Sequence, residues 1–471
     1  MKIKELLVIF WTAVSIAAAF PIYGEFTTGT IFEKVDCQAD PGQSYALYLP
    51  PGYPGEKKWP VIYAFDPGAR GAIPLHYFKA AAEKYGYIIA GSNNAKNGPG
   101  EPIARAINAV WLDTQKRFSI DNNRVYTTGF SGGSRMASTF KYVVNQPATG
   151  IIGCGAGLNA NLKPDMIKPE IYYGMVGLWD FNYREMMKLD KDFDAEGVVH
   201  HILVFEGAHS WPPEEYCLQA VEWMEINAIK KGLKEKNKSL AADLYKKALD
   251  RANHLEQTGN ISFAVPAYEA AEELFSGLVE VNEIKNKVLQ LKNSKEYKQF
   301  QKEERKRDKK DAEFVRLFIQ VTAKLKNTDS ADLPGLETVL QELKIRYLQK
   351  EANKTGKKAN RYDAILAQRL LMDLTLNMSR EGSDYIQKGD FGRAAIFLEI
   401  AARAGNERPN LIYNLACLYS LARNKKKALD YFRQAVKKGF NDLELIKKDK
   451  DLDFIREEKE FKEITQAIND N

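Results

Sequence analysis

Residues 124–137 read RVYTTGFSGGSRMA, in which Ser131 stands midway between Gly129 and Gly133. The β-branched and aromatic run before Gly129 predicts a strand, and the small residues after Gly133 predict a helix. A serine at such a turn has strained backbone angles, and glycines two residues to either side relieve the contact between strand and helix. The motif predicts that Ser131 is an exposed nucleophile; the alternative is an ordinary glycine-rich turn.

The sequence around this motif alternates predicted strands with predicted helices. Strands are expected at 45–49, 60–65, 87–91, 125–129, 151–155, 172–177 and 201–205. Helices are expected at 75–84, 102–117, 132–144, 182–190 and 213–231. Such alternation indicates a mostly parallel sheet with covering helices. We therefore expect residues 43–232 to form a doubly wound α/β domain, preceded by an N-terminal segment at 20–42.

A repeated helical pattern follows this domain. Residues 409–442 can be laid over residues 375–408 at a period of 34 residues. Small residues such as Gly382 would let paired helices approach, and large ones such as Tyr385 would fill the space between them. This spacing resembles the tetratricopeptide (TPR) repeat, with a weaker copy at 245–278. The resemblance implies an all-α repeat region that docks a protein partner.

Bulk composition and charge fit this two-part organisation. The 471 residues are 45% hydrophobic and 28% charged, as expected for a globular protein of more than one domain. The net charge of +6 is uneven, with roughly −3 on residues 21–232 and roughly +8 on the helical region 233–471. A charged run at 295–311 predicts a long solvated helix or a flexible bridge. Its signs are mixed and its aromatic residues few, so no nucleic-acid partner is expected.

The first residues have the features of a secretory signal peptide. Lys2 and Lys4 precede an apolar stretch at 6–19 that ends in three alanines. This stretch, at about 14 residues, is shorter than the ~18–20 needed to span a bilayer, which favours a cleaved signal over an anchor. We expect residues 1–19 to be removed and the mature protein to be periplasmic or extracellular, without a membrane span.

The cysteines give no sign of a metal or organic cofactor. Cys37, Cys154, Cys217 and Cys417 match neither a zinc pattern nor a C-x-x-C redox pair. Because three of them precede residue 232 and one follows it, at least two are expected to be unpaired or buried.

A nucleophilic serine needs a histidine to take its proton, with an acidic residue between the two in chain order. His209 lies in EGAHSWP, just after the predicted strand 201–205, and is therefore the predicted base. The position of each other histidine suits this role less well: His76 comes too early, His254 lies in the helical region, and His200 and His201 begin a strand.

The acidic residue must hold Nδ1 of the histidine. Asp180 follows the predicted strand 172–177 directly and is the predicted third member of a catalytic triad. A plain helix N-cap is the alternative role for this aspartate. Asp192 and Asp194 are rival candidates in a charged stretch further from a strand end.

Stabilising the negative oxygen formed in the reaction requires two N–H donors. Gly132, next after the serine, is predicted to supply the first. The second is expected from the loop DPGARG at 66–71, after strand 60–65. Proline lacks an N–H, so the donor is Gly68 or Ala69, and we favour Gly68.

Three more side chains are predicted to contact substrate. Trp179 and Trp211 flank the predicted triad and could line an apolar pocket, although aromatic residues at a sheet edge are as often plain packing. Arg70 lies near the predicted mouth and could bind a substrate carboxylate; the alternative is an ordinary surface arginine.

The predicted α/β domain resembles the polyhydroxybutyrate depolymerase and feruloyl esterase-like branch of the α/β-hydrolases. The likeness lies in IDNNRVY at 120–126, GFSGG at 129–133 and HSWP at 209–212. It implies hydrolysis of carboxylic esters through an acyl-enzyme, without a cofactor. One departure is Asp66-Pro67, because the family usually has His-Gly after this strand.

The main functional hypothesis is therefore an exported serine hydrolase that cleaves a small-molecule or polymer-linked ester. A serine peptidase of the same fold is one alternative. A non-catalytic interaction protein that retains the hydrolase scaffold is another, because helical repeats are binding devices.

Overall fold

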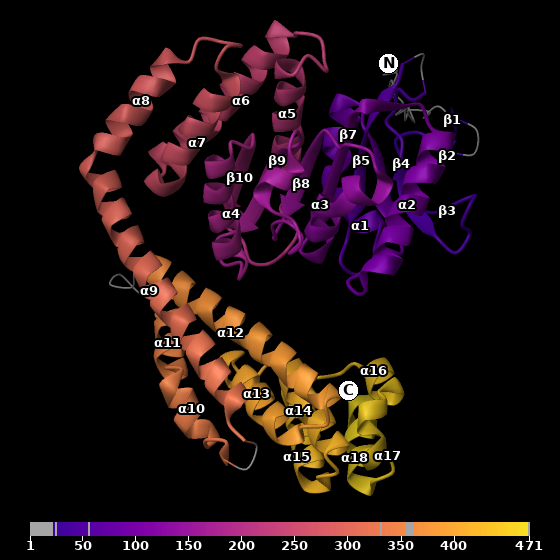
Figure 1. Cartoon of the computed structure of the whole chain (residues 1–471), viewed down its shortest axis with the longest axis vertical. Coiled ribbons are helices and arrows are strands. Elements are labelled where there is room, and N and C mark those ends of the chain that lie inside the picture. Colours follow the sequence, from indigo (N-terminus) through magenta and orange to yellow (C-terminus); the bar gives the residue numbers. More distant parts are fainter. Residues whose placement is uncertain (1–21, 24–25, 55–56, 330–331, 355–360, 470–471) are drawn as a thin grey trace, which may run out of the picture. The chain divides into compact units, whose positions relative to one another are not determined.

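The computed structural model describes residues 22–469, except 24–25, 55–56, 330–331 and 355–360 (Figure 1). The predicted signal peptide lies outside the described residues. The chain divides into two compact units. The first holds the residues up to Val176, Glu185–Leu203 and Ser210–Leu244; the second holds Tyr245 onward and two short segments, Gly177–Arg184 and Val204–His209. The division after Leu244 lies within a helix, beyond the boundary predicted at residue 232.

Most of an eight-stranded sheet belongs to the first unit. Its strands are β3 (Ile31–Asp36), β4 (Ser44–Tyr48), β5 (Trp59–Phe65), β6 (Ile88–Ser92), β7 (Ile120–Phe130), β8 (Gly150–Cys154), β9 (Ile171–Gly177) and β10 (His200–Phe205). Their order across the sheet is β10-β9-β8-β7-β5-β6-β4-β3. The pairs β6–β5, β5–β7, β7–β8 and β8–β9 are parallel, whereas β4 is antiparallel to both β3 and β6.

Helices lie between successive strands from β5 to β10, and one more helix follows β10. They are α1 (Ala72–Tyr85), α2 (Gly100–Arg117), α3 (Gly132–Val144), α4 (Tyr183–Glu196) and α5 (Glu214–Lys230), with a short 3-10 helix η1 (Pro164–Ile167). Helix α1 contacts α5, and α2 contacts α3. The predicted fold class, a doubly wound and mostly parallel α/β sheet of the hydrolase kind, is confirmed.

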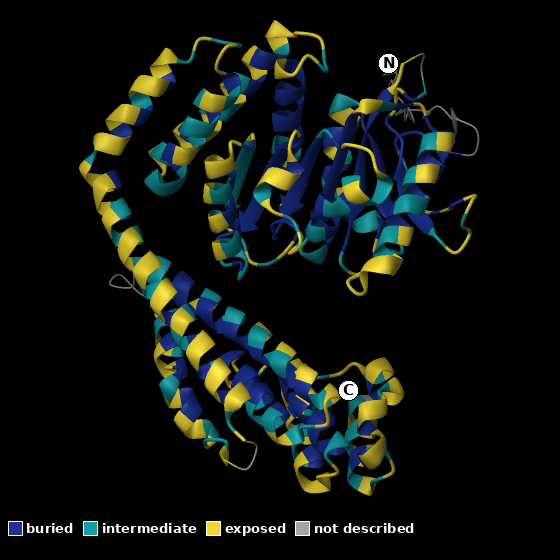
Figure 2. Ribbon diagram, viewed as in Figure 1, coloured by how far each residue is buried: buried dark blue, intermediate teal, exposed yellow. Residues whose placement is uncertain are grey.

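The seven strands predicted from the sequence correspond to β4–β10, and five of them are completely buried. Strands β4, β5, β6, β8 and β9 are buried along their whole length (Figure 2), so they read as unbroken apolar runs. The edge strand β3 was not predicted, because Glu33 and Lys34 are exposed and a bulge interrupts its pairing with β4. The short hairpin of β1 (Ile22–Tyr23) and β2 (Phe26–Thr27) was also not predicted.

Helices form almost all of the second unit. They are α6 (Lys238–Gln257), which begins in the first unit, α7 (Ile261–Phe275), α8 (Asn282–Asn293), α9 (Lys295–Asn327), α10 (Leu336–Glu342), α11 (Ile345–Ala352), α12 (Arg361–Gln387), α13 (Phe391–Ala404), α14 (Pro409–Leu421), α15 (Lys425–Lys437), α16 (Leu443–Lys448), η3 (Lys450–Leu452), α17 (Asp453–Arg456) and α18 (Lys459–Asn469). The charged run at 295–311 belongs to α9, one continuous helix of 33 residues, and is not a flexible bridge.

Small and aromatic residues lie where neighbouring helices of this unit meet. A Cβ added to Gly382 of α12 would lie 2.6 Å from Cγ of Leu398 on α13. On the same pair of helices, the rings of Tyr385 and Phe397 stack with centroids 5.5 Å apart. Helix α13 also contacts α14, and α14 contacts α15. The region 375–442 is therefore a run of helices that each pack on the next.

Two further predictions concern the described residues. No helix among them is both long and apolar enough to cross a membrane. All four cysteines are free thiols with buried side chains. Burial is the main cause that raises the pKa of Cys37 and that of Cys154 to about 12, so both are uncharged at neutral pH.

Candidate active site

Ser131 occupies the turn between β7 and α3. Its backbone angles are φ 53° and ψ −117°, a region that non-glycine residues seldom enter and that clusters at functional sites. The turn is held by its own backbone, since Ser131 N–H donates to the carbonyl of Cys154 at 2.8 Å and its carbonyl accepts from Ser134 N–H at 3.0 Å. The strain is therefore fixed by the sheet and the first turn of the helix.

The two flanking glycines are required by close backbone contacts. A Cβ added to Gly129 would lie 2.2 Å from the backbone of Gly133. A Cβ added to Gly133 would lie 2.0 Å from the carbonyl oxygen of Phe65, at the end of β5. Any side chain at either position would push the helix away from the strands, so the spacing of the motif has a steric cause.

His209 and Asp180 are in direct contact within the second unit. Nδ1 of His209 lies 2.9 Å from each carboxylate oxygen of Asp180. The carboxylate is fully buried, whereas the imidazole is 20% exposed. Asp180 also accepts the N–H of Asn182 at 2.8 Å. This geometry places the proton of a neutral imidazole on Nδ1 and the lone pair on Nε2, as a general base requires.

The segments that carry these two residues are joined by their backbones. Leu178 N–H donates to the carbonyl of Phe205 at 2.8 Å, and Trp179 N–H donates to that of Gly207 at 2.9 Å. A Cβ added to Gly177 would lie 2.3 Å from the carbonyl oxygen of Gly207. The acid and the histidine therefore belong to one hydrogen-bonded piece of chain, formed where β9 and β10 end.

The rival residues have other contacts. Asp192 forms an ion pair with Lys188 along α4. His200 bonds to the carbonyl of Val198 at 2.8 Å and to Asp190 at 3.2 Å, and Asp194 lies 3.9 Å from its Nε2. Burial lowers the pKa of His201 to about 4, and its ring packs on Tyr173 with centroids 5.1 Å apart. These contacts suit structural histidines.

Asp66 organises the loop in which the second oxyanion donor was predicted. Its buried carboxylate accepts Gly68 N–H at 2.9 Å, Arg70 Nε–H at 2.8 Å and Trp211 Nε1–H at 3.2 Å. Burial alone would raise the pKa of Asp66, but the hydrogen bonds from Arg70, Gly68 and Trp211 hold it below its usual value. The carboxylate is thus charged, and three donors from Gly68, Arg70 and Trp211 satisfy its hydrogen-bonding capacity.

This network bears on the roles predicted for three residues. Gly68 N–H is committed to the Asp66 side chain and Ala69 N–H to the Asp66 carbonyl at 2.9 Å, so neither points to a reacting oxygen. Arg70 pairs with Asp66 but keeps 60% of its side chain exposed, so its contact with a substrate carboxylate stays a prediction. Sequence reasoning missed the role of Asp66, for which the only signal was the departure from His-Gly.

The two tryptophans predicted to line a pocket differ from each other. Trp211 is 8% exposed and packs between Tyr77 and Phe130, each with ring centroids 5.6 Å away. Trp211 is therefore a packing residue that also holds Asp66. Trp179 is half-buried, and the guanidinium of Arg361 lies 5.6 Å from its ring. Phe181, which follows Asp180 directly, lies with its ring centroid 4.2 Å from that of His209.

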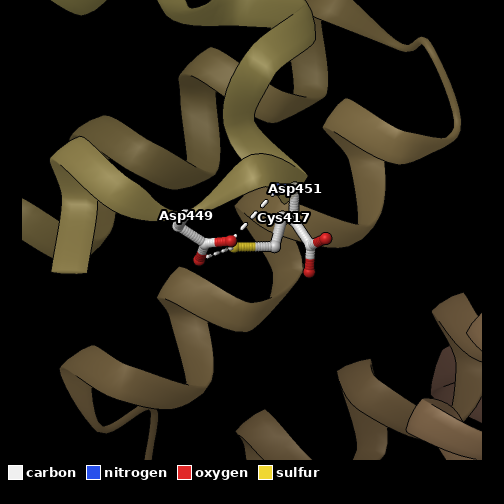
Figure 3. Close-up of side chains that lie close together, drawn as sticks. All are labelled: Cys417, Asp449 and Asp451. Atoms are coloured by element: carbon white, nitrogen blue, oxygen red, sulfur yellow. Dashed lines mark hydrogen bonds between the residues drawn. The ribbon is translucent and has the colours of Figure 1, made fainter.

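A cluster of possible metal ligands lies among the last helices (Figure 3). It consists of Cys417, Asp449 and Asp451. Asp449 accepts hydrogen bonds from the hydroxyl of Tyr413 at 2.8 Å, from the thiol of Cys417 at 3.5 Å and from Asp451 N–H at 3.0 Å. Burial raises the pKa of Cys417, which disfavours the thiolate that a metal would need. The cluster is explained as a cap on η3.

The fold and the serine turn define an α/β-hydrolase-like domain. Its solved-structure neighbours are serine hydrolases and esterases. The serine hydrolase FphF of Staphylococcus aureus is 13% identical, with 39% of this chain and 92% of that one covered at a TM-score of 0.33. An inhibited esterase B of Lactobacillus rhamnosis is 15% identical, with 44% and 89% covered at 0.35. Thermogutta terrifontis esterase 2 is 10% identical, with 41% and 92% covered at 0.33.

These scores are too low to carry any argument about activity. No family model and no curated protein matches the chain.

Proposed function

We propose that the protein is a serine hydrolase that cleaves carboxylic esters, with Ser131 as nucleophile, His209 as general base and acid, and Asp180 as the residue that orients the imidazole. The observation that carries the proposal is the positive φ of Ser131, held between two glycines that tolerate no side chain. A strained serine at a strand-to-helix turn supports a functional role, because folding gains nothing from the strain. The buried carboxylate on Nδ1 of His209 supports the choice of base.

In the proposed reaction, Oγ of Ser131 attacks the ester carbonyl carbon while its proton passes to Nε2 of His209. The tetrahedral intermediate then expels the alcohol, which takes that proton from the imidazolium, and an acyl-enzyme remains. Water repeats the two steps in the same order, releasing the carboxylic acid and restoring the serine. Asp180 keeps its negative charge throughout and stabilises the imidazolium.

The ester preference rests on the resemblance to polyhydroxybutyrate depolymerases and feruloyl esterases, so a small-molecule or polymer-linked ester is the proposed substrate class. We further propose export through the signal peptide at 1–19. The helical region from residue 233 would dock a protein partner through its TPR-like repeats.

Labelling with a fluorophosphonate probe tests the proposed nucleophile. Full-length protein should react, S131A should not, and S131A should lose hydrolysis of short p-nitrophenyl esters. The matched control is S134A, one turn further along the same helix, whose hydroxyl donates to the carbonyl of Ala156 at 2.7 Å. It should still be labelled. Folded wild-type protein that resists the probe, or S131A that is labelled equally well, would exclude the proposal.

The peptidase alternative is separated by substrate. An ester and an amide of the same carboxylic acid should be compared with one preparation. Faster turnover of the ester supports the proposal, and faster turnover of the amide supports a peptidase.

A further inference from the structure

Because Asp66 accepts the N–H groups of its own loop, the proposed oxyanion site keeps one backbone donor, the N–H of Gly132. Gly132 N–H begins helix α3, and helix-starting N–H groups lack partners within the helix. Among the hydrogen bonds of the described residues, none uses this N–H. The two N–H groups expected to assist it, those of Gly68 and Ala69, are both bonded to Asp66. A second donor must therefore come from another segment.

Asn97 lies against the serine turn, within the first unit. It belongs to the loop between β6 and α2. An isolated antiparallel bridge joins the preceding Lys96 to Gly68, and Asn97 N–H donates to the carbonyl of Pro67 at 2.9 Å. The backbone of Asn97 is thus hydrogen-bonded to the loop 66–71, which does not supply the second oxyanion donor.

The side chain of Asn97 contacts Gly132. A Cβ built on Gly132 would lie 1.8 Å from Oδ1 of Asn97 and 2.8 Å from its Nδ2, so the amide fills the space that a side chain at Gly132 would need. Asn97 is exposed, and its side-chain amide makes no hydrogen bond to any other described residue. An amide with unused donors stands beside the N–H that follows the nucleophile.

We propose that the side-chain amide of Asn97 is the second oxyanion donor. The inference rests on the proposed function, because it assigns a role at the same serine. The amide carries two N–H donors, and a half-turn about its terminal bond exchanges them with the oxygen. In the reaction Nδ2–H and Gly132 N–H would both donate to the oxygen of the tetrahedral intermediate. Asp66 does not oppose this negative oxygen, because its own charge is paired with Arg70.

The test compares N97A and N97D with wild type on a p-nitrophenyl ester. Loss of one oxyanion donor lowers kcat roughly 10²–10³-fold and leaves KM nearly unchanged, because the bond forms only as charge develops. N97D keeps the size of the side chain but places a negative charge at the oxyanion, so its kcat should fall further. K96A, on the preceding exposed residue, should match wild type. Melting temperatures of all variants should agree, since Asn97 is exposed.

A second readout uses phenylboronic acid, which adds to a reactive serine as a tetrahedral anion. N97A and N97D should bind it more weakly than K96A does. If N97A and N97D keep kcat and boronate affinity within about twofold of wild type, the role of Asn97 is overturned while the proposal for Ser131 stands. If wild type itself fails to hydrolyse esters and to react with the fluorophosphonate, the proposed function falls first.

Discussion

The serine turn and the segments that carry Asp180 and His209 are built in different ways. Ser131 is fixed by local backbone contacts, in which glycines let α3 touch the ends of the strands. Gly177–Arg184 and Val204–His209 instead form one compact unit with the helices from Tyr245 onward. The proposed nucleophile therefore depends on the sheet, whereas the proposed base and acid also depend on the helical region.

Two arginines of α12 contact the segments that carry Asp180 and His209. The guanidinium of Arg369 on α12 lies 4.0 Å from the ring centroid of Tyr183, three residues after Asp180. Arg361, at the start of the same helix, lies over Trp179 and pairs with Glu206 at 2.7 Å. Both ends of the Asp180–His209 piece are therefore contacted by one helix, and changes there should reach the histidine without altering the serine turn.

The largest effect is expected when the acid is neutralised. D180N should lower kcat about 10⁴-fold, because an amide holds the imidazole in the wrong tautomer and does not stabilise its charge. Steady-state ester hydrolysis measures the change. D192N removes a half-buried carboxylate that pairs with Lys188 on α4, and it should leave kcat unaltered. A D180N enzyme with nearly full activity would separate Asp180 from the chemistry.

A methyl group at the serine turn should come next in size. G133A places a Cβ 2.0 Å from the carbonyl oxygen of Phe65 and should cost about 3 kcal/mol in unfolding free energy, with loss of fluorophosphonate labelling. Urea unfolding provides the measurement. G100A is the control, since no atom lies within 4 Å of its added Cβ. Equal stability of the two variants would contradict the steric account of the turn.

Removing the cation over Tyr183 should have a moderate effect that distinguishes the two regions. R369M loses a desolvated cation–π contact of about 2 kcal/mol, and the segment after β9 should loosen. Hydrogen exchange should become faster at the amides of Leu178 and Trp179 and stay unchanged at Ser131. R380M, an exposed position on the same helix, should change neither. Equal acceleration at all three amides would indicate general destabilisation instead.

The smallest effect is expected at Arg361. Its ion pair with Glu206 is half-exposed on both sides, so R361A should change unfolding free energy by about 1 kcal/mol or less. Its influence on kcat should diminish as salt concentration rises. A large effect that salt does not alter would show that the contact with Trp179, and not the ion pair, holds the segment.

How much could be predicted from the sequence depended on the range of the interactions. The buried parallel strands were found because burial on both faces leaves an unbroken apolar run. Glycine spacing around Ser131 was also readable, because its cause lies within a few residues. The Asp66 network was not, since its partner Trp211 is 145 residues away and leaves no periodic signal.

The sequence also did not predict that Gly177–Arg184 and Val204–His209 belong to the helical unit. The sequence near Trp179 and Tyr183 does not indicate that Arg361 and Arg369 of α12 lie over their rings. Contacts between distant segments are set by the packing of whole elements, which residue periodicity does not encode.

The four buried thiols bear on how an exported chain of this kind would mature. Disulfide exchange requires an accessible thiolate, and burial both hides the sulfur atoms and keeps their protons in place. If the chain is exported as proposed, the folded protein should keep its four thiols unpaired in an oxidising compartment.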